Sequence, residues 1–429
     1  MQGVSMIGRS SQAKWAAVTG APLPTFRRKE RTMARFPSHH PMRVISVGAA
    51  AALIVLVSGC GSGEGLSDDT SKPSSGGGVA ADVPTMEQLY KGLGDPPPTT
   101  GPTPPKNKTV WWVSCGEKIP ACSARTEFGR AAAGLLGWTF KVADGNLNAN
   151  GGWQTAMRQA IAAKPDAIIA SAMDCATIEQ PLKEAKAAGI PVVADTASDC
   201  DSPIGGNGGT SLFSGPTKFS TAAPTAGDYL KSLGTAGAAY IINKTGGSAK
   251  IITAVIQAPL GLAIDEGFQA EIKKCSGCSV VGSFTFRPAD TTAGGPFAQA
   301  LQAALVKHPD ANVVYMPLDS ELQSAGGARI VKQTGRDILV VGGQGTDPAV
   351  VAMTKSGDIA AMTSVTSTEW ISYAAMDTVL RVLAKAPTVN QGVGVIVIDA
   401  KHGIGEGDAV TTAAYDIKAS YSKLWGVGG

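Results

Sequence analysis

Short apolar runs alternate with amphipathic stretches along residues 109–343, and each kind of stretch predicts its own element. In the first half, the apolar runs predict strands at 109–114, 138–144, 166–172 and 190–195. Helical spacing of apolar residues lies between them, at 126–136, 152–163 and 176–189. The pattern then repeats, with strands expected at 249–256, 279–286, 311–317 and 337–343. Its helices are expected at 263–274, 295–307 and 320–334.

This alternation determines the expected fold class. Strands that alternate with helices of about ten to fifteen residues form βαβ units around a parallel sheet. Two such series in a chain of 429 residues predict an α/β protein with two doubly wound, Rossmann-like lobes. Ligands bind outside the carboxyl ends of the strands in such sheets, so we expect a ligand cleft between the lobes.

A separate apolar run at 44–57 precedes the predicted lobes. Arg43 comes before this run, and the sequence Val57-Ser58-Gly59-Cys60 ends it. This is the order of a secretory signal, and the run is shorter than the ~20 residues of a membrane span. The ending resembles a bacterial lipobox, which implies that 42–59 is a lipoprotein signal peptide and that Cys60 becomes the lipidated N-terminus. An ordinary secretion signal with a chance cysteine is the alternative.

Residues 1–41 are basic and irregular and do not fit this signal. We interpret them as a misassigned upstream segment, with Met42 as the true start. Arg27-Arg28 instead suggests a twin-arginine signal, although the pair lies 16 residues before the apolar run. After Cys60, a stretch rich in Gly, Ser and Pro predicts a flexible tether over 60–106, within which 85–94 has the helical spacing to dock on the body.

The net charge of +3 comes from the N-terminal segment and not from the predicted lobes. Residues 1–59 hold eight Lys and Arg and one acid, so residues 60–429 hold 29 basic and 33 acidic residues. A mildly acidic body has no electrostatic footprint for nucleic acid. After residue 59 only His308 and His402 remain, which leaves little material for histidine-based catalysis or a histidine metal site. We expect no metal, no cofactor and no enzymatic activity, since the sequence shows no nucleophile–base pair, phosphate loop or metal cluster.

The order of several segments resembles one protein family. TVWWVS, the run 143–174 and PLKEAKAAGIPVVAD are similar to the first half of type I periplasmic binding proteins of the ribose/galactose group. AKIITAVI, DEGF, VKHPDANVVYMPLD and ILVVGGQGTDP match the second half. The resemblance covers about residues 107–415 and implies three crossovers between the lobes, near Ser214, Val365 and Thr388. The lobes it implies are 107–214 with 366–387, and 215–365 with 388–429.

For function, the resemblance implies an extracytoplasmic solute-binding lipoprotein. Such a protein closes its two lobes on a small molecule and delivers it to the permease of an ABC importer. We expect a monomer, anchored through the lipid on Cys60 to the outer face of the cytoplasmic membrane. A receptor module that reports the solute to a membrane signalling partner would have the same body, so this alternative stays open.

Polar residues at strand ends are the candidate ligand contacts. In the first lobe these are Ser114, Ser171 and Asp195, with Thr196 next in sequence. Asp195 is the main candidate, because a carboxylate accepts hydrogen bonds from two hydroxyl groups; the alternative is that it caps a turn. Glu117 and Lys118 follow the first strand at the cleft mouth. Lys118 would suit an anionic solute if it is not simply solvated.

The second-lobe candidates depart from the family's sugar pattern at three positions. The family's arginine, three positions before the Gly-Phe pair, is Ile264 here, and its asparagine before Asp319 is Leu318. The aspartate of its Gly-x-Asp-Gly turn is Gln344. Sugar hydroxyls against Ile264 and Leu318 would find no partner, at a cost of ~1–3 kcal/mol for each buried polar group.

This departure changes the expected ligand. A simple hexose or pentose fits poorly, and two alternatives remain. One is a partly apolar acid, and the other is a sugar or polyol held mainly by the first lobe and by an aromatic face. Trp112, Trp153 and Trp370 are the available aromatic side chains, unless they belong to the core.

Six cysteines follow Cys60, and an even number in an exported chain favours disulfides. Among the fifteen possible pairings, the predicted topology favours Cys115 with Cys122, Cys175 with Cys200, and Cys275 with Cys278. The first pair flanks the loop after the first strand, the second lies at one sheet edge, and the third closes a CSGC turn. Zinc is not expected, because no second Cys-x-x-Cys occurs.

Overall fold

The computed structural model describes residues 79–427. The chain separates into units of residues 1–70 and 71–429, and every described residue belongs to the second unit. The predictions for 1–41, for the signal peptide 42–59, for Cys60 and for the first part of the tether therefore lie outside the described residues. Within 79–427, no helix is long and apolar enough to cross a membrane.

The first lobe contains a five-stranded parallel sheet with the order β2-β1-β3-β4-β5. Its strands are β1 Thr109–Ser114, β2 Thr139–Asp144, β3 Ala167–Ala170, β4 Val192–Ala194 and β5 Gly215–Pro216. All four residues of β3 are buried. A run buried on both faces is expected for a central strand of a parallel sheet, because helices cover both faces.

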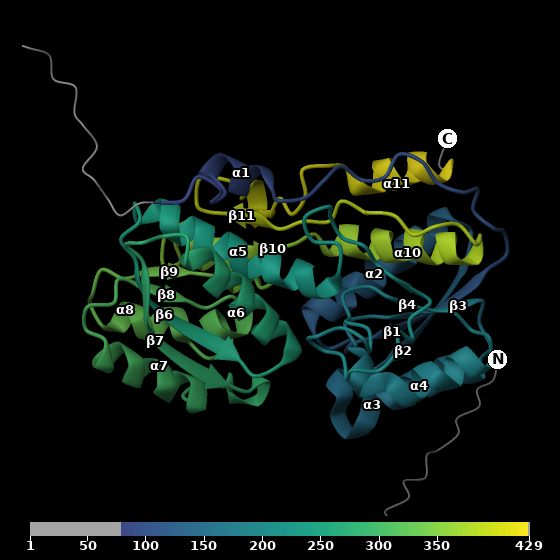
Figure 1. Ribbon diagram of the computed structural model, residues 1–429, viewed down its shortest axis with the longest axis horizontal. Coiled ribbons are helices and arrows are strands. Elements are labelled where there is room, and N and C mark those ends of the chain that lie inside the picture. Colours follow the sequence, from purple (N-terminus) through teal and green to yellow (C-terminus); the bar gives the residue numbers. More distant parts are fainter. Residues whose placement is uncertain (1–78, 428–429) are drawn as a thin grey trace, which may run out of the picture. The chain divides into compact units, whose positions relative to one another are not determined.

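Helices form the two outer layers of this lobe. They are α2 Pro120–Leu135, α3 Gly152–Ala162 and α4 Cys175–Ala187, joined from far along the chain by α10 Thr368–Leu383. In Figure 1, α3 and α4 lie on one side of the sheet, and α2 and α10 on the other. Helix α2 begins six residues before its predicted start, because Pro120 occupies the first helical turn, where its missing N–H costs nothing.

The second lobe has a four-stranded parallel sheet with the order β7-β6-β8-β9. Its strands are β6 Lys250–Ile256, β7 Ser279–Phe286, β8 Val313–Tyr315 and β9 Leu339–Val341. An antiparallel pair, β10 Met362–Val365 with β11 Ile396–Ile398, lies beside it. The helices are α5 Ala226–Lys244, α6 Pro259–Ile272, α7 Pro296–Lys307, α8 Gly327–Gln333 and α9 Pro348–Ser356. Both lobes therefore have the predicted α/β class.

The predicted helix at 320–334 is broken in the structure. A π-helical turn, η3 Ser320–Ser324, comes first, and α8 follows only after Gly326 in the left-handed region at φ 75°. Glu321 of this turn is fully buried, and the backbone N–H of Leu318 donates to its Oε2 at 3.3 Å. Burial raises the pKa of Glu321 well above its usual value, and the nearby Asp319 carboxylate adds to the effect.

The chain passes between the lobes at three places. The first passage follows β5 and leads to α5, the second leads from β10 to α10, and the third returns from α10 to β11. The N–H of Gln391 in the third passage donates to the carbonyl oxygen of Lys218 in the first at 2.9 Å. These passages lie near the residues where the family resemblance implies crossovers, with β5 extending two residues beyond Ser214.

Residues 79–106 differ from the flexible tether that we predicted for 60–106, because they pack against both lobes. Helix α1 Met86–Lys91 begins with a capping box between Thr85 and Gln88. Its Leu89 side chain is fully buried, and the helix contacts α5 and β11. The helical apolar spacing of 85–94 therefore does form a docked helix.

The six described cysteines form three disulfides, in the predicted pairing. Their pairs are Cys115–Cys122, Cys175–Cys200 and Cys275–Cys278. The first joins the end of β1 to the first turn of α2, and the second joins the start of α4 to the loop after β4. Two of the three bridges therefore fix loops at the carboxyl edge of the first-lobe sheet.

Candidate solute-binding cleft

A cavity of about 300 Å³ lies between the lobes, at the carboxyl ends of the first-lobe strands. The first lobe lines it with Arg125, Trp153, Ala172, Asp174, Thr177 and Thr196. The second lobe lines it with Tyr229, Leu230, Leu233, Ala258, Pro259, Leu260, Gln344 and Ser364, and the second passage between the lobes adds Thr366. The position agrees with the cleft that the strand pattern predicts, and the volume suits a small molecule.

Asp195 organises the first-lobe wall of this cavity and does not line it. It follows β4, its side chain is buried, and both of its carboxylate oxygens accept hydrogen bonds. The donors are the Ser171 hydroxyl at 2.6 Å, the Ala172 N–H at 2.8 Å, and the N–H and hydroxyl of Thr196. These contacts agree with the alternative that Asp195 caps a turn. Ser171 is one of the hydrogen-bond donors to Asp195.

Arg125 brings a positive charge into the cavity, and sequence reasoning missed it. Its Nη1 donates to the hydroxyl of Thr196 at 2.6 Å and lies 3.5 Å from Asp195. The Nε atom is buried without a hydrogen-bond partner among the described residues. From α10, the hydroxyl of Ser372 donates to the Arg125 carbonyl oxygen at 3.0 Å. The guanidinium is therefore positioned by its neighbours, and part of its donor capacity is unused.

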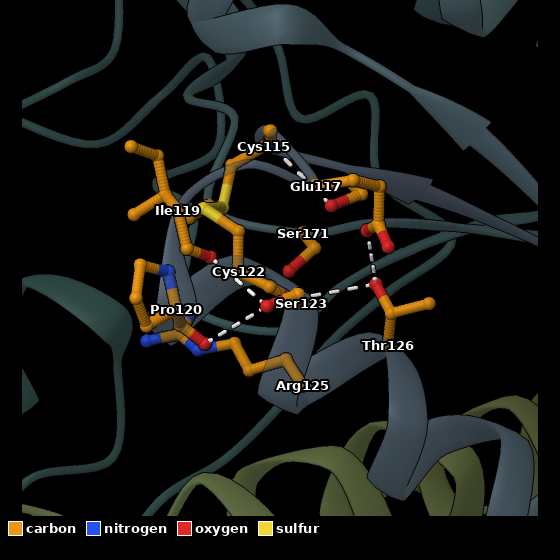
Figure 2. The surroundings of a disulfide bond; sticks show 12 residues. Cys115, Glu117, Ile119, Pro120, Cys122, Ser123, Arg125, Thr126 and Ser171 are labelled. Atoms are coloured by element: carbon orange, nitrogen blue, oxygen red, sulfur yellow. Dashed lines mark hydrogen bonds between the residues drawn. A yellow bond between two sulfur atoms is a disulfide. The ribbon is translucent and has the colours of Figure 1, made fainter. Parts of the chain in front are cut away.

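The loop between β1 and α2 sets the position of α2, the helix that carries Arg125 (Figure 2). The Cys115–Cys122 bridge closes the loop, and the Thr126 hydroxyl donates to the Glu117 carboxylate at 2.6 Å. Ser114 is buried and accepts from the Gly116 N–H at 3.3 Å, while Lys118 is exposed. Ser114 and Glu117 thus support the loop, and neither lines the cavity.

Asp174 is an acidic group of the cavity wall that we did not predict. It precedes α4, and the Ser198 N–H donates to its Oδ1 at 2.9 Å. Burial raises its pKa above the usual value, although this hydrogen bond opposes the change. Ala172, two residues earlier, has φ at 54°, a left-handed conformation that is strained for a residue other than glycine. The loop that carries Asp174 is therefore held in a specific shape at the cleft.

Of the four second-lobe candidates, only Gln344 reaches the cavity. Asp319 accepts hydrogen bonds from the backbone N–H groups of Gln344, Thr346 and Asp347 at 2.7–3.0 Å, and so it builds the turn that presents Gln344. Ile264 and Leu318 are buried in the core. The backbone of α6 at Ile264 meets α5 at Gly234, where a Cβ would lie 1.9 Å from the Ile264 carbonyl oxygen. Neither Ile264 nor Leu318 lines the cavity.

Other second-lobe residues take the places that we expected Ile264 and Leu318 to fill. The Ser364 side chain is 1% exposed, and its hydroxyl has no hydrogen-bond partner among the described residues. Tyr229 is buried beside it in the wall, and burial raises the pKa of its hydroxyl to about 12. Leu230, Leu233 and Leu260 give the rest of this wall an apolar surface. One wall is thus largely apolar, with isolated hydroxyl groups.

The three candidate tryptophans have different surroundings. Trp153 lines the cavity, and its Nε1 donates to the Cys115 carbonyl oxygen at 3.1 Å. Trp112 is fully buried. Trp370 is also buried, and its Nε1 donates to the carbonyl oxygen of Gln391 at 2.8 Å in the third passage between the lobes. Of the three tryptophans, Trp153 is therefore the one that lines the cavity.

Among residues 79–427, one group has side chains close enough to hold a metal ion, namely Cys175, Asp199 and Cys200. Both sulfur atoms belong to a disulfide, so neither is the thiolate that zinc requires. Asp199 accepts from the N–H groups of Cys200 and Leu212 at 2.7 and 2.8 Å. This chemistry does not fit a metal site.

Comparison with known proteins is informative about the family. The model of a periplasmic binding protein domain matches residues 104–387. A comparison with curated proteins gives no match. Many solved structures share the fold. One is the periplasmic binding protein of an arabinose ABC transporter from Shewanella sp. ANA-3, with 21% identity and a TM-score of 0.53, over 74% of this chain and 95% of that one.

Two further structures have similar scores. A glucose-galactose binding protein from Geobacillus stearothermophilus has 20% identity and a TM-score of 0.55, over 69% of this chain and 99% of that one. A Mycobacterium smegmatis ABC transporter solute-binding protein with bound glycerol has 20% identity and a TM-score of 0.53, over 71% and 99%. At these identities the structures establish the shared two-lobed fold.

The family model covers more than half of the chain, including both predicted lobes up to the end of α10. This match, the two parallel sheets and the cavity between them agree with the family that the sequence segments resemble. The chain belongs to the periplasmic binding protein family, and it shares its fold with the binding proteins of sugar ABC transporters.

Proposed function

We propose that this protein captures a small solute in the cleft between its lobes and delivers it to an ABC importer. The observation that carries the proposal is the cavity itself, which both lobes line and into which the half-buried Arg125 side chain is built. Solved relatives are described as bound to arabinofuranose and to glycerol. These names support a solute of that size for this chain.

The walls of the cavity support a more specific proposal about the ligand. The first lobe contributes Arg125, Asp174 and Thr196, whereas the second contributes mainly leucine, alanine and proline carbon. Burial of apolar ligand surface contributes ~25 cal/mol per Å². A hydroxyl against that wall would lose its hydrogen bonds to water. We therefore propose a solute with one polar edge and one apolar face, and not a simple hexose or pentose.

Calorimetry with the purified protein tests both parts. The panel contains glucose, galactose, ribose, arabinose, polyols including glycerol, aromatic acids and steroid acids. We expect a less hydroxylated member to bind more tightly than any of the common monosaccharides. Micromolar binding of a common monosaccharide would contradict the ligand proposal and leave solute capture supported. Failure of the whole panel, with folded protein, would count against solute capture in this cleft.

We also propose that lipid on Cys60 anchors the protein to the outer face of the cytoplasmic membrane. The support is the short apolar run that ends in Val57-Ser58-Gly59-Cys60. The test compares wild type with Cys60→Ala after fractionation of cells grown with a labelled fatty acid. We expect the label and the membrane association to be lost together. A variant that stays in the membrane fraction with its label would contradict the lipobox interpretation.

A further inference from the structure

Residues 79–106, here called the strap, run along both lobes before the first strand begins. The family resemblance begins only at about residue 107, and a simple tether would not contact both lobes. The strap contacts the second lobe first, then the passages between the lobes, and finally the first lobe. Figure 1 shows it reaching from the neighbourhood of α1 to that of α11 Ile417–Trp425.

The strap is fastened first to the second lobe. Val79 pairs with Cys275 of the CSGC turn, and Asp82 forms an ion pair with Lys274 at 2.7 Å. The buried Leu89 side chain then fixes α1 against α5 and β11. Next to it, the Tyr90 hydroxyl donates to Asp399 at 2.6 Å, and the Tyr90 ring stacks on His402. This end of the strap therefore moves with the second lobe.

The middle of the strap contacts two of the three passages between the lobes. The Asp95 carboxylate accepts from the N–H of Thr221 in the first passage at 2.5 Å and from Nδ2 of Asn390 in the third at 2.7 Å. Its own N–H donates to the carbonyl oxygen of Gly392 at 3.0 Å. Burial opposes ionisation of Asp95, but these hydrogen bonds lower its pKa below the usual value. One carboxylate thus joins two hinge segments.

The backbones are closely packed at this crossing. A Cβ on Gly94 would lie 2.5 Å from the carbonyl oxygen of Gly392, and a Cβ on Gly392 would lie 2.4 Å from that of Asp95. Gly392 also has φ at 81°, in the left-handed region. Larger residues at either position would separate the strap from the third passage, so the fit depends on glycine.

The far end of the strap is fastened to the first lobe. Nη2 of Arg381 donates to the carbonyl oxygen of Thr100 at 2.8 Å, and Nε1 of Trp138 donates to that of Pro105 at 2.8 Å. Arg381 is itself buried and paired with Asp377 at 2.6 Å. The proline-rich segment between Asp95 and Pro105 resists bending, because proline fixes φ. The strap is therefore a stiff connection with fixed points on both lobes.

We propose that the strap restrains the hinge and so sets how far and how often the lobes separate. Rotation of one lobe against the other changes the distance between the fixed points, and the Asp95 hydrogen bonds must then stretch or break. The strap would thus bias the protein toward one lobe arrangement by a differential contact energy. This proposal goes beyond solute capture and does not depend on which solute binds.

Distance distributions between spin labels test the proposal on ligand-free, full-length protein with Cys60→Ala. One label replaces exposed Lys186 of the first lobe, and the other replaces exposed Val306 of the second. Asp95→Ala removes the carboxylate that joins the passages. Asp82→Ala is the matched control, because Asp82 is also a strap acid with a bonded partner, but that partner, Lys274, is in the second lobe alone. We expect Asp95→Ala to shift or broaden the distribution, and Asp82→Ala to leave it unchanged.

Identical distributions for wild type and a folded Asp95→Ala variant would overturn the proposal. If that variant does not fold, Asn390→Ala takes its place; it removes the bond from Asn390 to Asp95 together with the side-chain bonds of Asn390 to Thr221 and Gly392. Amide exchange over 217–223 and 388–394 is the second readout, and we expect faster exchange in both segments. No solute is present in either measurement. Failure of the calorimetric panel would therefore reject solute capture without affecting the strap, and unchanged distributions would reject the strap alone.

Discussion

At the level of single residues, the cleft separates side chains that face the cavity from those that hold them in place. Asp195 has the residue type and strand-end position of a ligand contact, but its oxygens are occupied by Ser171, Ala172 and Thr196. Arg125 faces the cavity with an unused donor. The strand-end pattern thus indicates the Asp195 carboxylate, whereas the side chain that lines the cavity is that of Arg125, which contacts Asp195.

Replacement of Arg125 by alanine should weaken solute binding. A hydrogen bond to a charged group contributes about 1.5–3 kcal/mol, which corresponds to a loss of about ten- to a hundredfold in affinity. The measurement is the calorimetric Kd for the tightest-binding member of the panel. Arg130→Ala is the control, because Arg130 lies on the same helix but outside the cavity lining, where it pairs with the exposed Glu127 and lies over the Phe140 ring. Equal affinities for Arg125→Ala and wild type would show that Arg125 does not contribute to solute binding.

Glu321 should make the protein less stable as the pH rises. Its pKa is raised in the folded state, so above the ordinary value of 4.5 the unfolded chain releases a proton that the folded chain keeps. The free energy of unfolding therefore decreases with pH through this group. Glu321→Gln cannot titrate, so its Tm relative to wild type should increase between pH 4 and pH 7.5.

The control for this prediction is Glu406→Gln at an exposed position, which should show no such trend. A Tm difference between Glu321→Gln and wild type that stays constant from pH 4 to pH 7.5 would show that Glu321 titrates alike in both states.

At the level of elements, sequence periodicity predicts those strands and helices whose positions depend on local burial. Strands β1 to β4 and β6 to β9 were predicted within a few residues, because short apolar runs between helical patterns have few other interpretations. The two-residue strand β5 was not predicted. The break at Gly326 was missed, since a left-handed glycine inside an apolar periodic stretch does not interrupt the period. Ile264 lies at the contact of α5 with α6, which no pattern within α6 records.

The site was predicted less well than the fold for a related reason. The predicted strand ends lead to Thr196 and Gln344, which line the cavity, and to Asp195, which lies behind Thr196. Arg125 lies in the second turn of a helix, and its inward direction depends on the Cys115–Cys122 bridge and on α10. The sequence did contain a signal for Arg125. It follows Cys122, a member of a predicted disulfide, by three residues, or about one helical turn.

The three disulfides should stabilise the protein in the order of the loops they close. The bridges span 25, 7 and 3 positions of sequence for Cys175–Cys200, Cys115–Cys122 and Cys275–Cys278. In the chain-entropy model these loops correspond to about 3.5, 2.5 and 2 kcal/mol. Urea unfolding of the three paired-serine variants measures the losses. A larger loss for Cys275 and Cys278 than for Cys175 and Cys200 would contradict this order.

At the level of the whole molecule, the strap makes the folded body longer than the family match. A protein that begins at residue 79 should be more stable than one that begins at residue 107. The shorter protein exposes the surface of α5 and β11 that Leu89 covers, and burial of one leucine contributes about 1.5–3 kcal/mol. Denaturant midpoints of the two proteins measure the difference. Equal midpoints would mean that the strap contacts do not contribute to stability.

The attachment of Val79 beside Cys275 has a consequence for encounter with a membrane partner. Nineteen positions separate Cys60 from Val79, and a chain of that length spans at most about 65 Å. With the proposed lipid on Cys60, the second lobe would stay within that distance of the bilayer. One molecule confined to such a volume has an effective concentration on the order of millimolar. An importer in the same membrane would then meet its binding protein within a layer about 65 Å deep, so the encounter frequency would depend on the surface density of the anchored protein and not on its concentration in a surrounding volume.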